Sequence, residues 1–266
     1  MVNEKNKKPI VLVIAGHDPS GGAGVQADIE SIANAGCHAT TVITSLTAQN
    51  TNTITTITPQ DSIFFREQIK LVLDDMDILA CKIGMIGSPE LVDTIHDALS
   101  NTEIPIVLDP VINSETGKNL SSEKTYEKII SSLLPLTTII TPNTVEAKIL
   151  TNCEDLKFAA NKLLNYGTKA VLITGTHEAT NDVINTFYTK DSVPINYTWE
   201  RLPNTFHGSG CTLSSRIAAN LALENNLEKA VKDAQKYTWE TLKNGLHLGK
   251  GQIHPNRFFI KKNNVL

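Results

Sequence analysis

Residues 10–36 read I-V-L-V-I-A-G-H-D-P-S-G-G-A-G-V-Q-A-D-I-E-S-I-A-N-A-G. The first run, residues 10–15, is apolar and β-branched without alternation, which predicts a strand covered on both faces. A glycine-rich turn spans residues 16–24, and apolar side chains then recur at helical spacing before a glycine at position 36 that can end a helix. Strand, turn and helix therefore open the chain.

The same alternation continues along the rest of the sequence. The patterns predict strands over residues 41–46, 53–58, 78–83, 104–108, 136–140 and 170–173, and a hairpin of 183–188 with 196–202. They predict helices over 60–73, 89–99, 123–134, 143–150, 156–166, 211–224 and 227–246. We expect a single α/β domain over residues 1–266 with a mostly parallel sheet, preceded by a flexible segment at residues 1–9. Ligands in such sheets gather beyond the carboxyl ends of the strands.

Composition narrows the class of protein. The 266 residues are 41% hydrophobic and 20% charged, which is typical of a globular chain. A formal net charge of -4 leaves no basic excess for nucleic acid or an anionic membrane surface, so we expect neither partner. Four scattered cysteines without a C-x-x-C pair, and the lack of a secretory signal or a long apolar run, favour a reduced cytoplasmic location.

The segment H-G-S-G-C-T, residues 207–212, precedes an apolar helical pattern. Its glycines allow backbone N–H groups to converge, and the helix N-terminus adds positive potential, so the segment predicts an anion site. Cys211 falls in the first turn, where a thiol pKa is expected to be lowered, and it is a candidate base. The alternatives are a small packed core residue or, less favoured, the nucleophile of a cysteine hydrolase.

Polar residues follow two predicted strands. Asp109 ends the strand at 104–108, whereas Asn143 and Glu146 follow the strand that ends near residue 140 and share one helix face. Together they supply oxygen ligands of the kind that hold Mg²⁺ and its waters. Asn143 and Glu146 can instead be a helix N-cap and a first-turn charge. Lone loop histidines do not indicate zinc.

The first glycine-rich turn matches neither the phosphate loop G-x-x-x-x-G-K-[ST] nor the dinucleotide fingerprint. It is either a tight turn with Asp18 and Ser20 as local caps or a ligand-binding loop at the end of the first strand.

Six blocks taken together resemble the hydroxymethylpyrimidine and phosphomethylpyrimidine kinases of thiamine biosynthesis, a branch of the ribokinase-like superfamily. They are G-H-D-P-S-G-G-A-G-V-Q-A-D, L-T-A-Q-N-T, K-I-G-M-I-G-S, L-D-P-V, T-P-N-T-V-E-A and H-G-S-G-C-T, and they occur in the family's order. The resemblance implies a ribokinase-like three-layer αβα sandwich, usually a homodimer. It also implies a phosphotransferase that uses ATP and Mg²⁺ to phosphorylate hydroxymethylpyrimidine and then its monophosphate.

The resemblance also assigns residues. Cys211 corresponds to the catalytic base, and the N–H groups of Gly208, Ser209 and Gly210 would hold the transferred phosphoryl group. Gln49 resembles the side chain that hydrogen-bonds the pyrimidine, because an amide both donates and accepts. The remaining pocket walls would come from Gly16, Asp28, Thr47, Met85 and Val111, and the ATP and phosphate contacts from Asn143, Glu146, Thr174 and Asp109, with Mg²⁺ near Asp109 and Glu146.

Three departures from the family pattern leave other functions open. T-G-T-H stands where K-G-G-H is common, His17 stands where a small Ser or Thr is usual, and residues 113–120 differ from S-G-D-x-L-L. A pyridoxal or pyridoxine kinase is the nearest rival, because those substrates also carry a hydroxymethyl group on a flat heterocycle. A ligand-binding relative without catalysis is the rival from another class.

Overall fold

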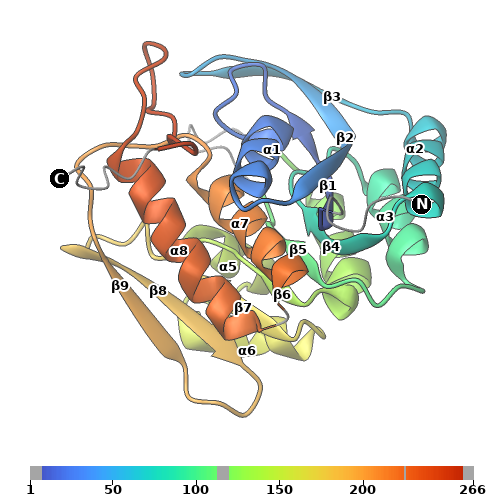
Figure 1. The fold of residues 1–266 in the computed structure, drawn as a ribbon. Coiled ribbons are helices and arrows are strands. Elements are labelled where there is room, and N and C mark those ends of the chain that lie inside the picture. The colour runs from blue at the N-terminus through green and yellow to red at the C-terminus, as the bar shows by residue number, and fades with distance from the viewer. Residues whose placement is uncertain (1–7, 113–119, 225, 260–266) are drawn as a thin grey trace.

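The computed structural model describes residues 8–112, 120–224 and 226–259, and the strands in these ranges form one nine-stranded sheet (Figure 1). The order is β3-β2-β1-β4-β5-β6-β7-β8-β9, with parallel pairing from β2 to β7 and antiparallel pairing of β3, β8 and β9. The strands are β1 (Ile10–His17), β2 (His38–Gln49), β3 (Ile54–Pro59), β4 (Ile78–Ile83), β5 (Ile106–Leu108), β6 (Ile139–Ile140), β7 (Ala170–Ile173), β8 (Asp182–Thr189) and β9 (Ile195–Glu200).

Helices cover both faces of this sheet. One face carries α1 (Gly24–Asn34), α7 (Ser209–Leu223) and α8 (Leu227–Lys243). The other carries α2 (Ser62–Asp75), α3 (Pro89–Leu99), α4 (Glu123–Lys128), α5 (Thr144–Thr151) and α6 (Leu156–Asn165). The expected three-layer αβα sandwich is confirmed.

The first strand shows why its sequence lacks alternation. Leu12 and Ile14 point into the core shared with α2 and α3, whereas Val11 and Val13 point into the core shared with α1 and α7. Successive side chains of a strand face opposite sides, so a strand with a helix layer on each side is apolar at every position. All four residues are fully buried, and each contributes roughly 1.5–3 kcal/mol of hydrophobic burial.

Several predicted bounds are confirmed to the residue, namely those of β4, α3 and β7. Two strands begin later than predicted, and β9 ends at Glu200 rather than at residue 202. β5 begins at Ile106 because Pro105 has no N–H to donate to the ladder, although its carbonyl still accepts from Cys81 N at 2.9 Å. β6 begins only at Ile139, because Leu136 belongs to a preceding helical turn.

The helix predicted over residues 123–134 is not continuous. It divides into α4, a π-helical turn η2 (Ile129–Leu133) and a 3-10 turn η3 (Leu134–Leu136). Pro135 lies in η3, where its missing N–H stops regular α-helical hydrogen bonding.

Two expectations fall partly or wholly outside the described ranges. Residues 1–7 of the segment expected to be flexible are not described, and Pro9 accepts a hydrogen bond from His38 N at 2.8 Å. Residues 113–119 of the divergent block are likewise not described, whereas Leu120 is buried. Among the described helices, none has both the length and the apolar character needed to cross a bilayer.

Candidate active site

A cavity of about 420 Å³ opens beyond the carboxyl ends of the parallel strands, where the sequence pattern predicts ligands. It extends from the first glycine-rich turn to the loop after β7 and the β8–β9 hairpin. Every candidate site residue except Asp28 lines it: Gly16, Thr47, Gln49, Met85, Asp109, Val111, Asn143, Glu146, Thr174, Gly208, Ser209, Gly210 and Cys211.

The start of α7 depends on Gly208. This residue has φ +84°, and a Cβ on it would lie 1.9 Å from the carbonyl oxygen of Gly22, so no other residue fits without displacing the first turn. No side chain caps the helix at Gly208. The first N–H groups of α7, at Ser209, Gly210 and Cys211, have no acceptor in the preceding helical turn and border the cavity, which is the geometry of an anion cradle.

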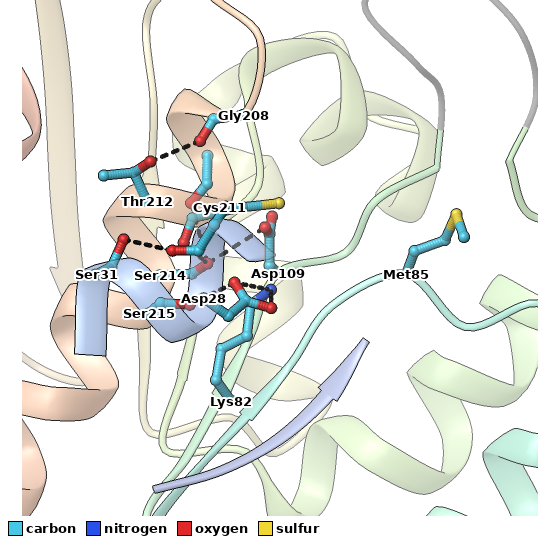
Figure 2. A network of polar contacts seen from close by, with 12 residues as sticks. Asp28, Ser31, Lys82, Met85, Asp109, Gly208, Cys211, Thr212, Ser214 and Ser215 are labelled. Carbon is cyan, nitrogen blue, oxygen red and sulfur yellow. Dashed lines mark hydrogen bonds and ion pairs between the residues drawn. The ribbon is translucent and has the colours of Figure 1, made fainter. Parts of the chain in front are cut away.

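Cys211 lies at this helix start, partly buried, with its sulfur beside the Asp109 carboxylate (Figure 2). Burial raises the pKa of the thiol to about 12, and the Lys82 charge and a hydrogen bond from Gly24 N–H only partly oppose this effect. The expectation of a lowered thiol pKa is therefore wrong. Desolvation is the largest cause of the rise, and the negative charges of Asp109 and Asp28 add to it.

Beneath the cavity floor lies an ion pair that the sequence analysis did not identify. Lys82 Nζ lies 2.9 Å from Asp28 Oδ1 and 3.1 Å from Asp28 Oδ2, and Ser215 Oγ donates to Asp28 Oδ1 at 2.5 Å (Figure 2). Burial alone would lower the pKa of Lys82, but the Asp28 carboxylate raises it above its ordinary value, so the ammonium stays charged. The signal available in the sequence was a lysine inside an otherwise apolar buried strand.

The expectation that Asp28 forms a wall of the substrate pocket is wrong. The carboxylate is fully buried and does not line the cavity, whereas Lys82 does. Asp28 therefore contacts Lys82 instead of forming a wall of the cavity. It projects from α1 toward Lys82 on β4 and Ser215 on α7, and a buried carboxylate is stable there only because it is paired and hydrogen-bonded.

Asp109 comes from the end of β5 and faces the start of α7. Ser214 Oγ donates to Asp109 Oδ2 at 3.3 Å, and a Cβ on Gly210 would lie 3.8 Å from each carboxylate oxygen. Burial raises the pKa of Asp109, and the Lys82 charge opposes that rise.

Asn143 and Glu146 form a capping box at the start of α5. Glu146 N donates to Asn143 Oδ1 at 2.9 Å, and Asn143 N donates to Glu146 Oε2 at 2.9 Å. The capping alternative is confirmed, yet both residues also line the cavity, so the cap orients them there. Thr174 forms a parallel bridge with Asn143, which brings the T-G-T-H loop to the same wall.

The first glycine-rich turn is organised by Asp18. Its carboxylate accepts from Ser20 N at 2.8 Å, Ala23 N at 2.8 Å and Ser20 Oγ at 2.7 Å, so the local-cap alternative is confirmed for Asp18. It is wrong for Ser20, whose hydroxyl donates to Asp18 and does not cap α1. The Asp18 carboxylate also lies 2.8 Å from His207 Nε2, which joins the turn to the H-G-S-G-C-T segment. Burial would raise the pKa of Asp18, but hydrogen bonds from His207, Gln49 and its own loop lower it below 3.8. Asp18 and His207 were missed as partners because they are far apart in sequence.

The carboxylates in the cavity suit a hard cation. Asp109 and Glu146 offer oxygen donors only, and the described residues contain no cluster of three or more His, Cys, Asp or Glu side chains placed to hold a metal. Mg²⁺ commonly binds one or two carboxylates and keeps waters and substrate phosphates as its other ligands, so this donor set fits it better than zinc.

The whole chain is similar to known proteins. The family model described as phosphomethylpyrimidine kinase matches residues 18–256. The chain is 37% identical over 248 residues to the hydroxymethylpyrimidine/phosphomethylpyrimidine kinase of Aquifex aeolicus, covering 91% of this chain and 97% of that protein. It also resembles the crystal structure of a phosphomethylpyrimidine kinase from Clostridium difficile 630, with a TM-score of 0.78, 34% identity and coverage of 88% and 100%.

A second solved structure is similar as well. The pyridoxal kinase from Staphylococcus aureus in complex with AMP-PCP and pyridoxal has a TM-score of 0.85, 26% identity and coverage of 94% of each chain.

Proposed function

This chain belongs to the phosphomethylpyrimidine kinase family, and we propose that it phosphorylates hydroxymethylpyrimidine with ATP and then phosphorylates the monophosphate to the diphosphate in thiamine biosynthesis. The observation that carries the proposal is the position of Cys211. Its thiol borders the cavity at the start of α7, beside the N–H groups of Ser209 and Gly210.

The anion cradle at α7 stabilises the transferred phosphoryl group. Its N–H groups point where negative charge develops, and they are held in place before substrate binds, so they cost no reorganisation during transfer. Gly208 makes this cradle possible because its φ of +84° lets the chain enter the helix against Gly22.

Cys211 takes the proton from the acceptor hydroxyl. Burial raises the pKa of this thiol to about 12, so the base role requires neighbouring groups that favour the thiolate. Lys82 supplies a fixed positive charge beneath the sulfur for that purpose. The Lys82 charge favours the Cys211 thiolate, which burial disfavours.

The pyrimidine occupies the end of the cavity near β1 and β2. Gln49 lines this end, and its amide hydrogen-bonds the Asp18 carboxylate, which fixes how the amide faces the ligand. Met85 and Val111 supply apolar walls, and the backbone of Gly16 lies close to Met85, since a Cβ on Gly16 would be 2.4 Å from Met85 Cε. Thr47 Oγ1 donates to His17 O at 2.8 Å and so holds the first turn against β2.

ATP occupies the other end, between the T-G-T-H loop and α8. Gly175 N donates to Asn185 Oδ1 at 3.0 Å, and Asn185 Nδ2 donates to Gln235 Oε1 at 2.9 Å, so this wall is tied to α8. Asn143 and Thr174 border the phosphates. Asp109 and Glu146 would hold Mg²⁺, whose charge would offset that of the phosphates.

Pyridoxal kinase is the second candidate, because a solved pyridoxal kinase in complex with AMP-PCP and pyridoxal matches this chain with a TM-score of 0.85. A coupled assay of ADP formation, run with hydroxymethylpyrimidine and with pyridoxal at equal concentrations, separates the two. We expect turnover of the pyrimidine and formation of its diphosphate. Turnover of pyridoxal alone would reject the proposal, and ligand binding without any ADP would favour a non-catalytic relative.

We also propose that the chain is one domain that acts in the cytoplasm as a homodimer, as the family resemblance suggests. Light scattering of the purified chain should give about twice the monomer mass, and a monomer would reject the dimer. One cooperative thermal transition is expected of a single domain, whereas two separated transitions would contradict it.

A further inference from the structure

Arg257 lies near the end of the described chain, and its side chain is only 1% exposed. Its guanidinium donates from Nε to Thr212 Oγ1 at 3.0 Å, from Nη1 to Gly21 O at 3.4 Å and from Nη2 to Gly22 O. The remaining contact is Nη1 to Glu30 Oε2 at 3.1 Å. Two of these four acceptors belong to the first glycine-rich turn, and a third, Thr212, belongs to the first turn of α7.

The Gly22 carbonyl lies directly against the start of α7. Gly22 O is the atom that a Cβ on Gly208 would approach to 1.9 Å, so a shift of the Gly22 peptide must move Gly208 or open a gap beside it. Arg257 holds this peptide by donating from Nη2 to the same Gly22 oxygen.

Thr212 carries the second link. Its hydroxyl accepts from Arg257 and donates to Gly208 O at 2.8 Å, and its backbone N–H donates to the same oxygen at 3.0 Å (Figure 2). The guanidinium therefore orients the first turn of α7, including the N–H groups of the anion cradle, through one intervening hydroxyl.

The chemistry of this contact set requires an arginine. A planar guanidinium has five donors in a rigid fork and can reach three diverging acceptors, whereas an ammonium is a compact point charge. Its carboxylate partner, Glu30, has a side chain that is 42% exposed, so the ion pair by itself does not account for burying Arg257.

The backbone around Arg257 is held independently of its side chain. Tyr237 Oη donates to Arg257 O at 2.9 Å, Asn256 N donates to Thr241 O at 3.0 Å, and His207 N donates to Ile253 O at 2.9 Å. Shortening the Arg257 side chain should therefore leave the segment docked while releasing the two loops.

We propose that Arg257 is a positioning residue for phosphoryl transfer, which locks the Gly21–Gly22 peptide and the first turn of α7 into one rigid cradle. This inference rests on the proposed function for its kinetic consequence. Misplacement of a reacting group by about 1 Å can cost roughly 10²-fold in rate. Substitution of Arg257 should therefore lower kcat and leave substrate affinity nearly unchanged.

The test compares Arg257→Met and Arg257→Lys with Arg216→Met in the full-length protein. Arg216, a second largely buried arginine, is the control: it lies on α7, where it stacks 4.2 Å from the Tyr237 ring and donates to Asn34 Oδ1 at 2.8 Å rather than to Gly21, Gly22 or Thr212. We expect both Arg257 variants to lose roughly 10²-fold in kcat per folded molecule, with KM for either substrate changed by less than about threefold. A kcat within twofold of the Arg216→Met variant would overturn the proposal.

Rescue separates positioning from folding. Arg257→Ala should regain part of its lost kcat with added methylguanidinium and none with methylammonium, because only the former restores the fork. Equal response to both cations, or none to either, would overturn the proposal even where the variant is less stable.

A measurement that needs no substrate tests the positioning role of Arg257 independently of the proposed function. The rate at which iodoacetamide labels Cys211, followed on its peptide by mass spectrometry, should change at least threefold in Arg257→Met and stay unchanged in Arg216→Met. Failure of the wild-type protein to phosphorylate the pyrimidine would reject the proposed function alone, whereas unchanged labelling in Arg257→Met would reject the positioning role.

Discussion

Lys82 Nζ and Asp28 Oδ1 lie 2.9 Å apart, and neither side chain is exposed to solvent. The pair comes from β4 and α1, and its Lys82 ammonium places a positive charge near Cys211 and Asp109 that the Asp28 carboxylate partly offsets. A buried ion pair is weak evidence for stability, because desolvation offsets much of its attraction. Its position beneath the thiol indicates that its charge serves the reaction.

Replacement of the pair tests this role. Lys82→Met should lower the free energy of unfolding by roughly 3–5 kcal/mol, because Asp28 is left as an uncompensated buried charge. The double variant Lys82→Met with Asp28→Leu should recover most of that stability in denaturant unfolding. Both variants should still show a kcat at least tenfold below wild type, since the charge that favours the Cys211 thiolate is gone. Wild-type kcat in the double variant would contradict the electrostatic role.

Removal of the thiol tests the base. Cys211→Ala should keep the dissociation constants of ATP and pyrimidine while lowering kcat by roughly 10²–10⁴-fold, the range for loss of a general base. Calorimetric titration and a coupled assay measure the two effects. Cys153→Ala is the matched control, because Cys153 is also a partly buried free thiol but does not line the cavity. A Cys211→Ala variant as active as Cys153→Ala would exclude the base role.

Shortening of Gln49 tests substrate recognition. Gln49→Ala should weaken pyrimidine binding by about 1–3 kcal/mol, because a polar edge of the ligand loses its partner in a closed site. The KM for ATP should stay within about twofold, because Gln49 lies at the end of β2, away from the T-G-T-H loop. Equal losses for both ligands would mean that Gln49 only supports the cavity.

Neutralisation of Asp18 gives a prediction with a defined pH dependence. Its pKa is lowered on folding, so its ionised form stabilises the protein fully above the ordinary value of 3.8, and this contribution is lost as pH falls toward the folded-state pKa. Asp18→Asn should therefore cost about 1–3 kcal/mol at pH 7 and progressively less below about pH 4, measured by urea unfolding.

A surface carboxylate provides the control for Asp18. Asp61 caps α2 by accepting from Ile63 N and Phe64 N, and Asn caps a helix about as well as Asp, so Asp61→Asn should change stability by less than about 0.5 kcal/mol at pH 7. A wild-type advantage over Asp18→Asn that grows as the solution is acidified would contradict the assigned linkage.

The sequence predicted best those helices and strands whose pattern of apolar residues has clear ends. β4, α3 and β7 have the predicted bounds, because each is an apolar run or an amphipathic helix with clear ends. β5, β6 and the helix after Ser122 differ, because Pro105 and Pro135 act on hydrogen-bonding partners that periodicity does not reveal.

The sequence by itself determined the layer order, the strand ends that carry the site and the glycine-framed segment around Cys211, because chain periodicity and glycine conformation are local properties. Only the tertiary structure decided that Asp28 holds Lys82 instead of lining the cavity, that burial raises the pKa of Cys211, and that His207 and Arg257 join the two glycine-rich segments. The reason is that ion pairing, desolvation and loop-to-loop hydrogen bonds depend on which distant residues share a buried volume. In the Asp18–His207 contact those residues are 189 positions apart.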